Sequence, residues 1–336
     1  MSSRLPLLVF HHRSVHNADA DDEMLVFSLS QQKPAREPGA RPPRRGERHL
    51  LGHAAGLDAP RQGARRVVPG LPVNPRTGDR LPLPDTWEDD DDCEIPQSCK
   101  CFLSHKDPTR PGCIVALFRR AAPVVWYCPT VAAGDGGSWS WRRYAYDIGD
   151  YPLPPAYRLP TKKIISVIAS FQEKPYFIDS TREVCAIDFS TTRPTLQCFD
   201  VHGLAVRFPH GMCSGREWLV ESQDQLFLVR VCFIDFDPDN IGAIDVYRMD
   251  FSSSTRVRWL RVHDIGDAVL LLEDANMAAS CPASALGLDA NRIYFMRNLV
   301  EDDADLCIFD LESNTLEIIR VHRHDGLLLC RIFVAS

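Results

Sequence analysis

The strongest constraint on the fold is a stretch between Arg216 and His263 in which apolar runs of strand length alternate with short polar segments. The polar segments contain Asp, Asn, Pro, Gly and Ser, which are typical of turns between strands. The four runs are REWLVESQ, QLFLVRVCFIDF, AIDVYRMDF and RVRWLRVHDI. In the first run Trp218 and Val220 alternate with acidic residues, whereas the second is continuously apolar, as in a strand buried on both faces. The stretch predicts one antiparallel meander of the size of a propeller blade.

Similar phrases recur along the chain. PYFID at 175–179 resembles IYFMR at 293–297, and VCAIDFS, DVYRMDFS and LCIFDLES each combine an apolar run, an acid and a turn. The units start roughly 50 residues apart, which is the spacing of a bladed β-array. We therefore predict an all-β chain that forms a single β-propeller domain over residues 1–336, with four-stranded antiparallel blades, about six in number. The second blade is expected to be damaged, and the role of the final apolar run, Leu327 to Val334, stays open.

Two segments depart from the strand pattern. Residues 33–66 are rich in Arg, Pro, Gly and Ala and contain no aromatic residue, so we predict a disordered or poorly ordered insert. The abrupt limits of this composition suggest the hypothesis that the segment is an out-of-frame reading of GC-rich coding sequence. Residues 85–98 contain the acidic run Glu88 to Asp92 and are expected to form a solvated loop.

Composition and charge place the chain in a reduced intracellular compartment, the cytoplasm or the nucleus. The net charge is −7, no apolar run is long enough to span a membrane, and Leu5 to Phe10 is too short for a signal-peptide core. Most of the twelve cysteines lie inside apolar runs, where free cysteine behaves as a small buried hydrophobe. Examples are Cys185, Cys198, Cys232, Cys307 and Cys330.

The ordered set of phrases from Trp218 to Glu312 resembles the KIB-type β-propeller domain found in plant F-box-associated proteins. The phrases that carry the resemblance are WLVESQDQLFLVRVCF, DVYRMDF, WLRVHDIGDAVLLLED, SCPASALGLDANRIYF and LCIFDLE. The similarity continues more weakly back to the turn Asn74 to Gly78 and to the N-terminal strands.

The resemblance implies a platform for protein binding, either for substrate recognition or for regulation. Proteins of this family usually carry an N-terminal F-box that docks onto a Skp-type adaptor of a ubiquitin ligase. Ahead of Leu5 this sequence has no Leu/Pro-rich helical pattern of that kind, so we expect no F-box and no direct Skp docking. The expected partner is a protein, such as a kinase or a ubiquitin-ligase substrate.

The sequence contains two candidate metal sites, and both have a simpler interpretation. Cys93, Cys99, Cys101, His105 and Cys113 form the densest Cys/His cluster, but Cys99 and Cys101 are too close for the usual zinc knuckle and no second knuckle follows. Asp235, Asp237 and Asp239 resemble the start of a calcium loop, but the later ligand positions do not match. We therefore predict loop and strand cysteines, a hairpin tip at Asp235–Asp239, and no metal.

Catalytic patterns are missing from the sequence. There is no strained G-x-S-x-G elbow for a nucleophile and no glycine-rich phosphate loop. Single histidines near strand ends are interpreted as structural; these are His202, His210, His263, His322 and His324. We expect a protein that is not an enzyme and uses no cofactor. A propeller-fold hydrolase or small-ligand-binding protein, or a degenerate non-functional relative, remain the alternatives.

Aromatic residues are the best sequence candidates for a partner-binding surface. Trp139 and Trp141, and then Tyr144 and Tyr146, recur at the two-residue spacing of one strand face, and packing between blades is the favoured explanation for them. Tyr151 and Tyr157 lie in a proline-rich connection and are freer. The named candidates are Trp139, Trp141, Tyr151 and Tyr157. The basic segment Arg36–Arg66 lacks interleaved aromatics, so we expect no nucleic-acid partner, and no membrane partner either.

Overall fold

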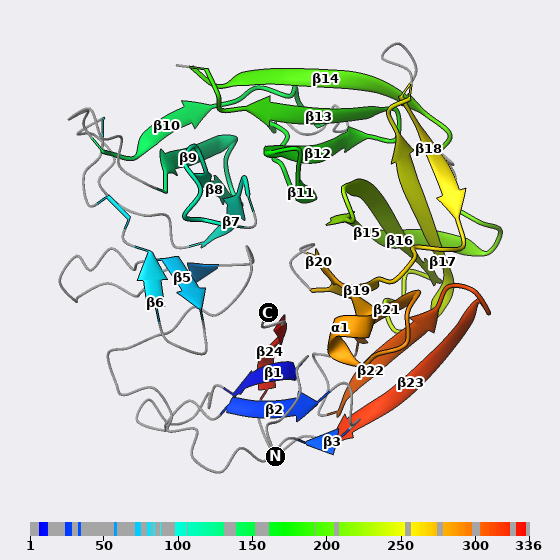
Figure 1. Ribbon diagram of the computed structural model, residues 1–336. Helices are drawn as coiled ribbons and strands as arrows, with labels where there is room; N and C mark the ends of the chain where they lie inside the picture. Colours follow the sequence, from blue (N-terminus) through cyan, green and yellow to red (C-terminus); the bar gives the residue numbers. More distant parts are fainter. Residues whose placement is uncertain are drawn as a thin grey trace. The chain divides into compact units, whose positions relative to one another are not determined.

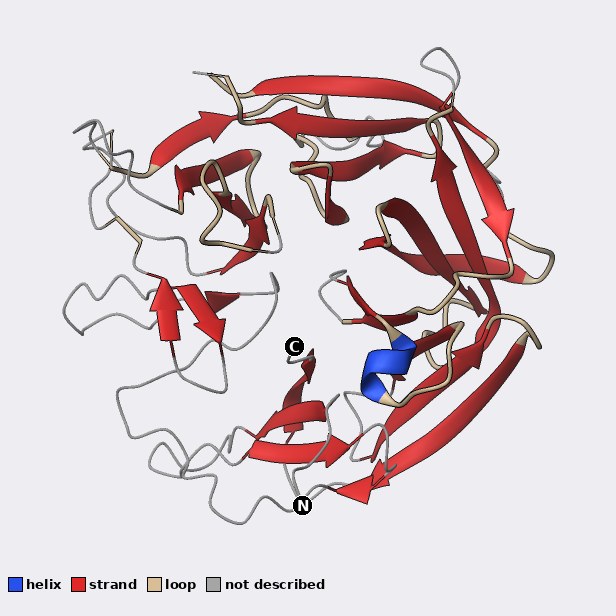
Figure 2. Ribbon diagram, in the orientation of Figure 1, coloured by secondary structure: helices blue, strands red, loops and turns tan. Residues whose placement is uncertain are grey.

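The structure is a computed structural model of the 336-residue chain. It describes residues 7–12, 24–28, 33–34, 57–58, 71–74, 79–81, 83–84, 88, 98–105, 107–130, 139–151, 161–191, 193–204, 208–252, 257–273, 278–297, 303–322 and 327–333. Strands dominate these residues, and the one helix among them is α1, Ala283–Leu286 (Figure 2). The all-β prediction is confirmed. No helix in the described ranges is long and apolar enough to cross a membrane.

The chain forms two compact units, which are described separately. Unit 1 contains Met1–His53, Ala205–Asp250 and Trp259–Ser336. Unit 2 contains Ala54–Leu204 and Phe251–Arg258.

The stretch that dominates the sequence pattern forms the antiparallel sheet predicted for it (Figure 1). Its strands are β15 (Met212–Ser222), β16 (Gln225–Ile234), β17 (Ile241–Asp250) and β18 (Val257–Val262). Gln223 and Asp224 join β15 to β16 with φ of 51° and 57°, the geometry of a two-residue hairpin turn. Trp218 and Val220 of β15 are buried, and Glu217 and Glu221 are half-buried, as the alternation in the sequence indicated. Leu219 is buried as well, so both faces of β15 are covered there.

The connection between β16 and β17 is the hairpin tip predicted at Asp235–Asp239. Asp235 and Phe236 have φ of 52° and 59°, and the Asp237 backbone N–H donates to the carbonyl of Ile234 at 3.0 Å. The side chain of Asp237 accepts the backbone N–H of Asp239 at 2.9 Å, so it stabilises the turn itself.

The last repeat in unit 1 differs from the predicted meander. Its sheet has the order β20-β19-β21-β22-β23. The strands are β19 (Val269–Leu272), β20 (Ala278–Cys281), β21 (Arg292–Arg297), β22 (Asp303–Asp310) and β23 (Thr315–His322). β19 pairs with β21 in parallel rather than antiparallel, and β20 was not predicted. The reason is the connection through β20 and α1, which is long enough for the chain to return in the same direction (Figure 1).

Both ends of the chain contribute to one sheet in unit 1, with the order β24-β1-β2-β3. The strands are β1 (Leu7–His12), β2 (Met24–Ser28), β3 (Lys33–Pro34) and β24 (Leu327–Phe333). Val9 lies opposite Arg331 in the antiparallel pair of β1 and β24. The final apolar run therefore closes this sheet against the first strand of the chain.

Unit 2 contains a sheet that includes the recurring phrases PYFID and VCAIDFS. Its strands, in spatial order, are β11 (Ile168–Phe171), β12 (Lys174–Ser180), β13 (Glu183–Asp188) and β14 (Thr195–His202). At the outer edge Val201 of β14 pairs in parallel with Val257, which also belongs to unit 2.

A second sheet of unit 2 positions the candidate site and has the order β10-β9-β8-β7-β4. Its strands are β4 (Leu57–Asp58), β7 (Ser98–Leu103), β8 (Ile114–Arg119), β9 (Val124–Pro129) and β10 (Arg142–Ala145). The sequence pattern did not predict β7. A separate hairpin of β5 (Leu71–Asn74) and β6 (Asp79–Leu81) flanks the turn predicted after Asn74.

Each unit has its own apolar core. In unit 1 one core cluster takes alternate residues from its strands and includes Trp218, Phe227, Leu270 and Phe309. In unit 2 they centre on Leu117, Trp126 and Trp141, together with the cysteines of β7 and β9. Close packing of such side chains supplies most of the driving force for folding.

The prediction for cysteine was right at two positions and wrong at two others. Cys232 and Cys307 are free and buried. Cys185 and Cys198, in contrast, form a disulfide between β13 and β14. They lie directly opposite each other in the register, with Cα atoms 4.0 Å apart, and the sequence alone does not reveal that pairing. The side chain of Cys330 lies outside the described residues.

The two segments that depart from the strand pattern are largely outside the described residues. Of the predicted insert 33–66, only β3 and β4 are described. Of the acidic segment 85–98, only Glu88 and Ser98 are described, and Ser98 is the first residue of β7. The prediction of a poorly ordered insert and a solvated acidic loop stays a prediction.

Candidate functional site

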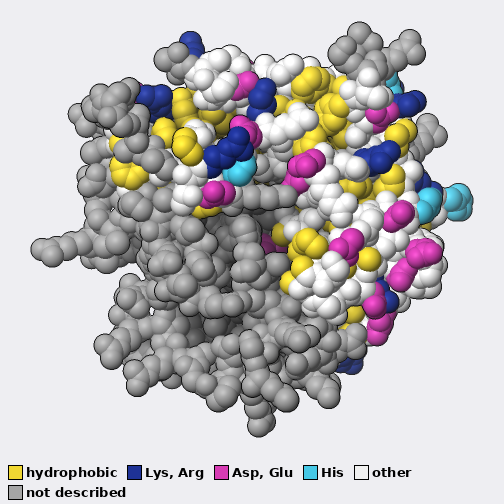
Figure 3. Space-filling model, viewed as in Figure 1, with side chains coloured by type: hydrophobic (Ala, Val, Ile, Leu, Met, Phe, Trp, Pro, Cys, Tyr) yellow, Lys and Arg dark blue, Asp and Glu magenta, His cyan; other side chains and the backbone are white. Residues whose placement is uncertain are grey.

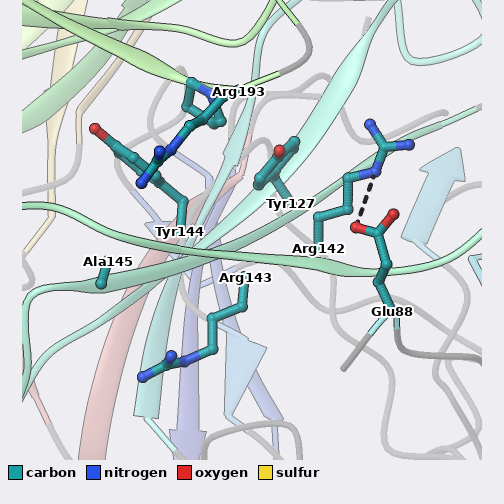
Figure 4. Close-up of a pocket in the computed structure, with 8 residues that line it drawn as sticks. Glu88, Tyr127, Arg142, Arg143, Tyr144, Ala145 and Arg193 are labelled. Atoms are coloured by element: carbon teal, nitrogen blue, oxygen red, sulfur yellow. Dashed lines mark ion pairs between the residues drawn. The ribbon is translucent and has the colours of Figure 1, made fainter. Parts of the chain in front are cut away.

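Unit 2 contains a hollow of about 340 Å³ whose lining combines arginine and tyrosine side chains (Figure 4). We call it the arginine–tyrosine pocket. Its lining residues are Glu88, Tyr127, Arg142, Arg143, Tyr144, Ala145, Arg193 and Pro194. The volume is at the lower end of the range for ligand sites, so the pocket suits one side chain or one small group.

The pleat of the sheet explains why three of these side chains share one face. Arg142 of β10 lies directly opposite Tyr127 of β9, and Tyr144 follows Arg142 by two residues. Side chains at this spacing point to the same face of a strand, and opposite partners share a face. Arg143 lies between them in sequence and extends from the other side of β10 (Figure 4).

The remaining part of the pocket comes from the connection between β13 and β14. This connection contributes Arg193 and the buried Pro194. Its Phe189 packs on the ring of Tyr127, with ring centroids 4.8 Å apart. The Thr191 hydroxyl donates to the carbonyl oxygen of Arg193 at 2.6 Å, which holds the backbone at this position. The Arg193 guanidinium reaches toward Tyr144 in Figure 4. Two separate sheets of unit 2 thus build one pocket.

Arg142 is held in the pocket by weak interactions. Its Nε lies 3.4 Å from the Glu88 carboxylate, and the two side chains are 39% and 57% exposed. An ion pair with this exposure is screened by water and contributes little to stability. The positive charge of Arg142 near the Tyr127 hydroxyl partly offsets the rise that burial causes in the pKa of Tyr127. Tyr127 therefore stays protonated at neutral pH and can donate a hydrogen bond into the pocket.

Arg193 is the cation in the pocket that is most available to a ligand. Its side chain is exposed, and within the described part of the chain it makes no ion pair. Tyr144 is half-buried and lines the same pocket. A guanidinium presents five N–H donors in a planar fork, which matches carboxylate or phosphate oxygens.

Comparison with protein families gives one match, the model described as the KIB1-4 beta-propeller, over residues 26–310. The chain belongs to the KIB1-4 β-propeller family. The predicted fold class and the resemblance to the KIB-type domain are both confirmed, whereas the number of blades stays a prediction. No curated protein matches the sequence.

The four aromatic candidates in this KIB1-4 propeller chain occupy different environments. Trp141 is 1% exposed and donates its indole N–H to the carbonyl of Pro84 at 3.0 Å, so it belongs to the core of unit 2. Trp139 is half-buried and donates to Pro129 at 2.9 Å. Tyr151 is 42% exposed. None of these three lines the arginine–tyrosine pocket. Tyr157 lies outside the described residues.

Sequence reasoning missed most of the pocket. Of its side chains only Tyr144 was singled out, as part of an aromatic face. The spacing of Arg142 and Tyr144 on a strand was a usable signal for a polar and aromatic face. Arg193 gave no signal, because its approach to β10 depends on how two sheets of the family fold pack.

The Cys/His candidates for a metal site in this KIB1-4 propeller lie partly in the core of unit 2 and partly in a turn after β7. Cys99 and Cys101 are buried in the core of unit 2, and burial raises the pKa of each to about 12, which keeps both thiols protonated. The Nδ1 atom of His105 accepts the backbone N–H of Asp107 at 3.0 Å. Cys93 lies outside the described residues. Among the described residues one group has the spacing of metal ligands, Glu183 with Cys185 and Cys198, and its two sulfurs are joined to each other.

The described histidine candidates are on the surface. His202, His210 and His263 are exposed. The side chains of His322 and His324 lie outside the described residues.

Proposed function

We propose that this β-propeller binds a protein partner through the arginine–tyrosine pocket. On this proposal it acts as a substrate-recognition or regulatory component related to F-box ubiquitin-ligase adaptors. The partner is a kinase or a ubiquitin-ligase substrate, and binding takes place in the cytoplasm or the nucleus. Binding, rather than turnover of a substrate, is the activity we propose, and neither a nucleic acid nor a membrane is required.

The observation that carries the proposal is the composition of the pocket. Tyrosine and arginine are the residue types most enriched at the energetically dominant positions of protein interfaces. In the pocket Tyr127 and Tyr144 supply rigid aromatic surface, and Arg142 and Arg193 supply directional hydrogen-bond donors. The membership of the chain in a propeller family supports the same conclusion, because a propeller offers a rigid scaffold for such surfaces.

Affinity purification from the source cells tests the proposal. The wild-type chain would be compared with the double variant Tyr144→Ala/Arg193→Ala and with Arg182→Ala. Arg182 is a matched control, because it is an exposed arginine of unit 2 outside the pocket. We expect one specific set of partner proteins with wild type and control, reduced about tenfold or more in the double variant. Equal recovery with all three chains would exclude the pocket as the binding surface. Failure to recover any partner, together with turnover in a hydrolase screen, would replace the proposal by the enzyme alternative.

A further inference from the structure

We propose that the arginine–tyrosine pocket binds the phosphate group of a phosphorylated side chain on the protein partner. The proposal rests on the protein-binding function and specifies the chemistry of the partner. It is carried by the charges, the hydrogen-bond donors and the size of the pocket.

The pocket is cationic although the chain as a whole is acidic. Arg142 and Arg193 line it against one glutamate, with Arg143 on the other side of β10, whereas the net charge of the chain is −7. On the face shown in Figure 3, Lys and Arg side chains are interspersed with Asp and Glu over the described residues. The excess of positive charge is therefore a local property of the pocket, and a local excess of this kind attracts anions.

The donors of the pocket match a group with several acceptor oxygens. Arg193 has no ion pair within the described residues, and the 3.4 Å contact of Arg142 with Glu88 leaves most of its N–H groups available. The hydroxyls of Tyr127 and Tyr144 add two neutral donors. Phosphate offers three strong acceptor oxygens and pairs with arginine in a bidentate manner.

Glu88 is the reason that we favour phosphate over a carboxylate. This residue already places one carboxylate at Arg142. A carboxylate ligand would exchange one singly charged partner for another, with little gain. A phosphorylated side chain carries about −1.5 to −2 charges at neutral pH, so it has the larger attraction needed to displace Glu88. The volume of about 340 Å³ accommodates one such side chain rather than a length of peptide.

Fluorescence anisotropy with labelled peptide libraries tests the proposal. Three libraries with random flanks would carry at the fixed position phosphorylated Ser, Thr or Tyr, the same residues without phosphate, or Glu. We expect the phosphorylated library alone to bind, with an affinity that falls as salt is added. Arg193→Ala should weaken binding about tenfold or more, since it removes a charged donor, and Arg182→Ala should leave it unchanged.

Glu88→Gln is a variant that should strengthen binding rather than weaken it. This substitution removes the competing carboxylate while keeping the shape of the side chain, so binding of the phosphorylated library should strengthen severalfold. A merely structural role of Glu88 would not produce tighter binding. Thermal unfolding of each variant identifies any loss of fold before the binding data are compared.

Three results would overturn the proposal. They are binding of the Glu library as tight as that of the phosphorylated library, equal binding of the unphosphorylated library, and binding that Arg193→Ala leaves unchanged. Phosphatase treatment of the cell lysate separates this inference from the function on which it rests. If the partner set is still captured after treatment, and is still lost in Tyr144→Ala/Arg193→Ala, protein binding stands and the phosphate inference fails. If the treatment abolishes capture, both are supported.

Discussion

Asp245 and Asp305 occupy the same position in two sheets of unit 1, each beside arginines of the flanking strands. Asp245 on β17 lies opposite Arg230 in the register and 2.5 Å from Arg261 on β18. Asp305 on β22 accepts a hydrogen bond from Arg297 on β21 at 3.1 Å and lies 3.7 Å from Arg320 on β23. Asp245 begins the phrase DVYRMDFS, and Asp305 immediately precedes LCIFDLES. The repetition in sequence therefore corresponds to a repeated set of ion pairs across neighbouring strands, which we call the ion ladder.

Removing the charge of Asp305 should destabilise the fold. Its side chain is 2% exposed, and Asp305→Asn would leave Arg297, which is 21% exposed, without its charged partner. We expect a loss of roughly 3 kcal/mol in the free energy of unfolding, because breaking a buried ion pair leaves an uncompensated charge. Urea denaturation of the variant measures this loss. Asp147→Asn is the control, since the ion pair of Asp147 with Lys162 is exposed and its removal should hardly move the midpoint. Equal midpoints for wild type and Asp305→Asn would contradict the role of the ladder.

In unit 2 the corresponding strands β13 and β14 are joined by the disulfide between Cys185 and Cys198 and not by an ion ladder. Glu183 immediately precedes the corresponding phrase VCAIDFS, but its register partners are Ser180 and Asp200, and no arginine lies opposite it. The bond closes a loop with a sequence separation of 13, for which chain entropy predicts a stabilisation of roughly 3 kcal/mol.

Thiol labelling and denaturation check the disulfide. Alkylation of the unfolded, unreduced chain should label two thiols fewer than alkylation after reduction. Cys185→Ser/Cys198→Ser should lower the urea midpoint of the oxidised protein, whereas Cys213→Ser should not, because Cys213 is free and exposed. If the purified protein shows twelve reactive thiols without reduction, the pair is not bonded under those conditions.

The burial of Lys100 should make the free energy of unfolding depend on pH. It is buried, its ammonium contacts the carbonyl of Ser166, and burial, helped by the charge of Arg120, lowers its pKa to about 8 from 10.5. Between these two values the unfolded chain binds a proton that the folded chain does not, so stability from this group rises with pH. Relative to Lys100→Met, wild type should therefore gain roughly 1 kcal/mol between pH 7 and pH 9. The difference in urea unfolding free energy at the two pH values measures the gain, and buried thiols common to both proteins cancel. A difference that stays constant or moves against wild type would contradict the prediction.

Truncation of two aromatic candidates from the sequence should reduce stability by very different amounts. Trp141 is in the core, so Trp141→Ala should cost roughly 4 kcal/mol by opening a cavity and leaving Pro84 without its donor. Tyr151 is 42% exposed, and Tyr151→Ala should change stability by no more than about 0.5 kcal/mol. Thermal and urea unfolding of both variants compare them directly. Similar losses for the two would mean that the burial of Trp141 is not as described.

The sequence predicted those parts of the fold that depend on local chemistry. Strand positions such as β12, β13, β16 and β17 followed from apolar runs between turn residues, and the tip at Asp235–Asp239 followed from its turn composition. These features are local because turn residues act on the backbone within a few positions.

Features that depend on long-range pairing were not predictable. The parallel pairing of β19 with β21 depends on where a long connection returns the chain, and no periodicity encodes that choice. The bond between Cys185 and Cys198 needs the register of two strands. The pocket brings Arg193 to a face formed by Tyr127 and Arg142, and this approach arises only when separate sheets pack. A sequence pattern gives the faces of strands but not which faces meet.

Site-specific photocrosslinking in the source cells shows whether the arginine–tyrosine pocket contacts a protein partner. A photoreactive amino acid would replace Tyr144 in the arginine–tyrosine pocket or Arg182 outside it, one position at a time. We expect the Tyr144 position to form a covalent adduct with a protein partner, and we expect no such adduct at the Arg182 position. If the Tyr144 position forms no adduct, or none beyond those formed at Arg182, the pocket is not the partner-binding surface of this propeller.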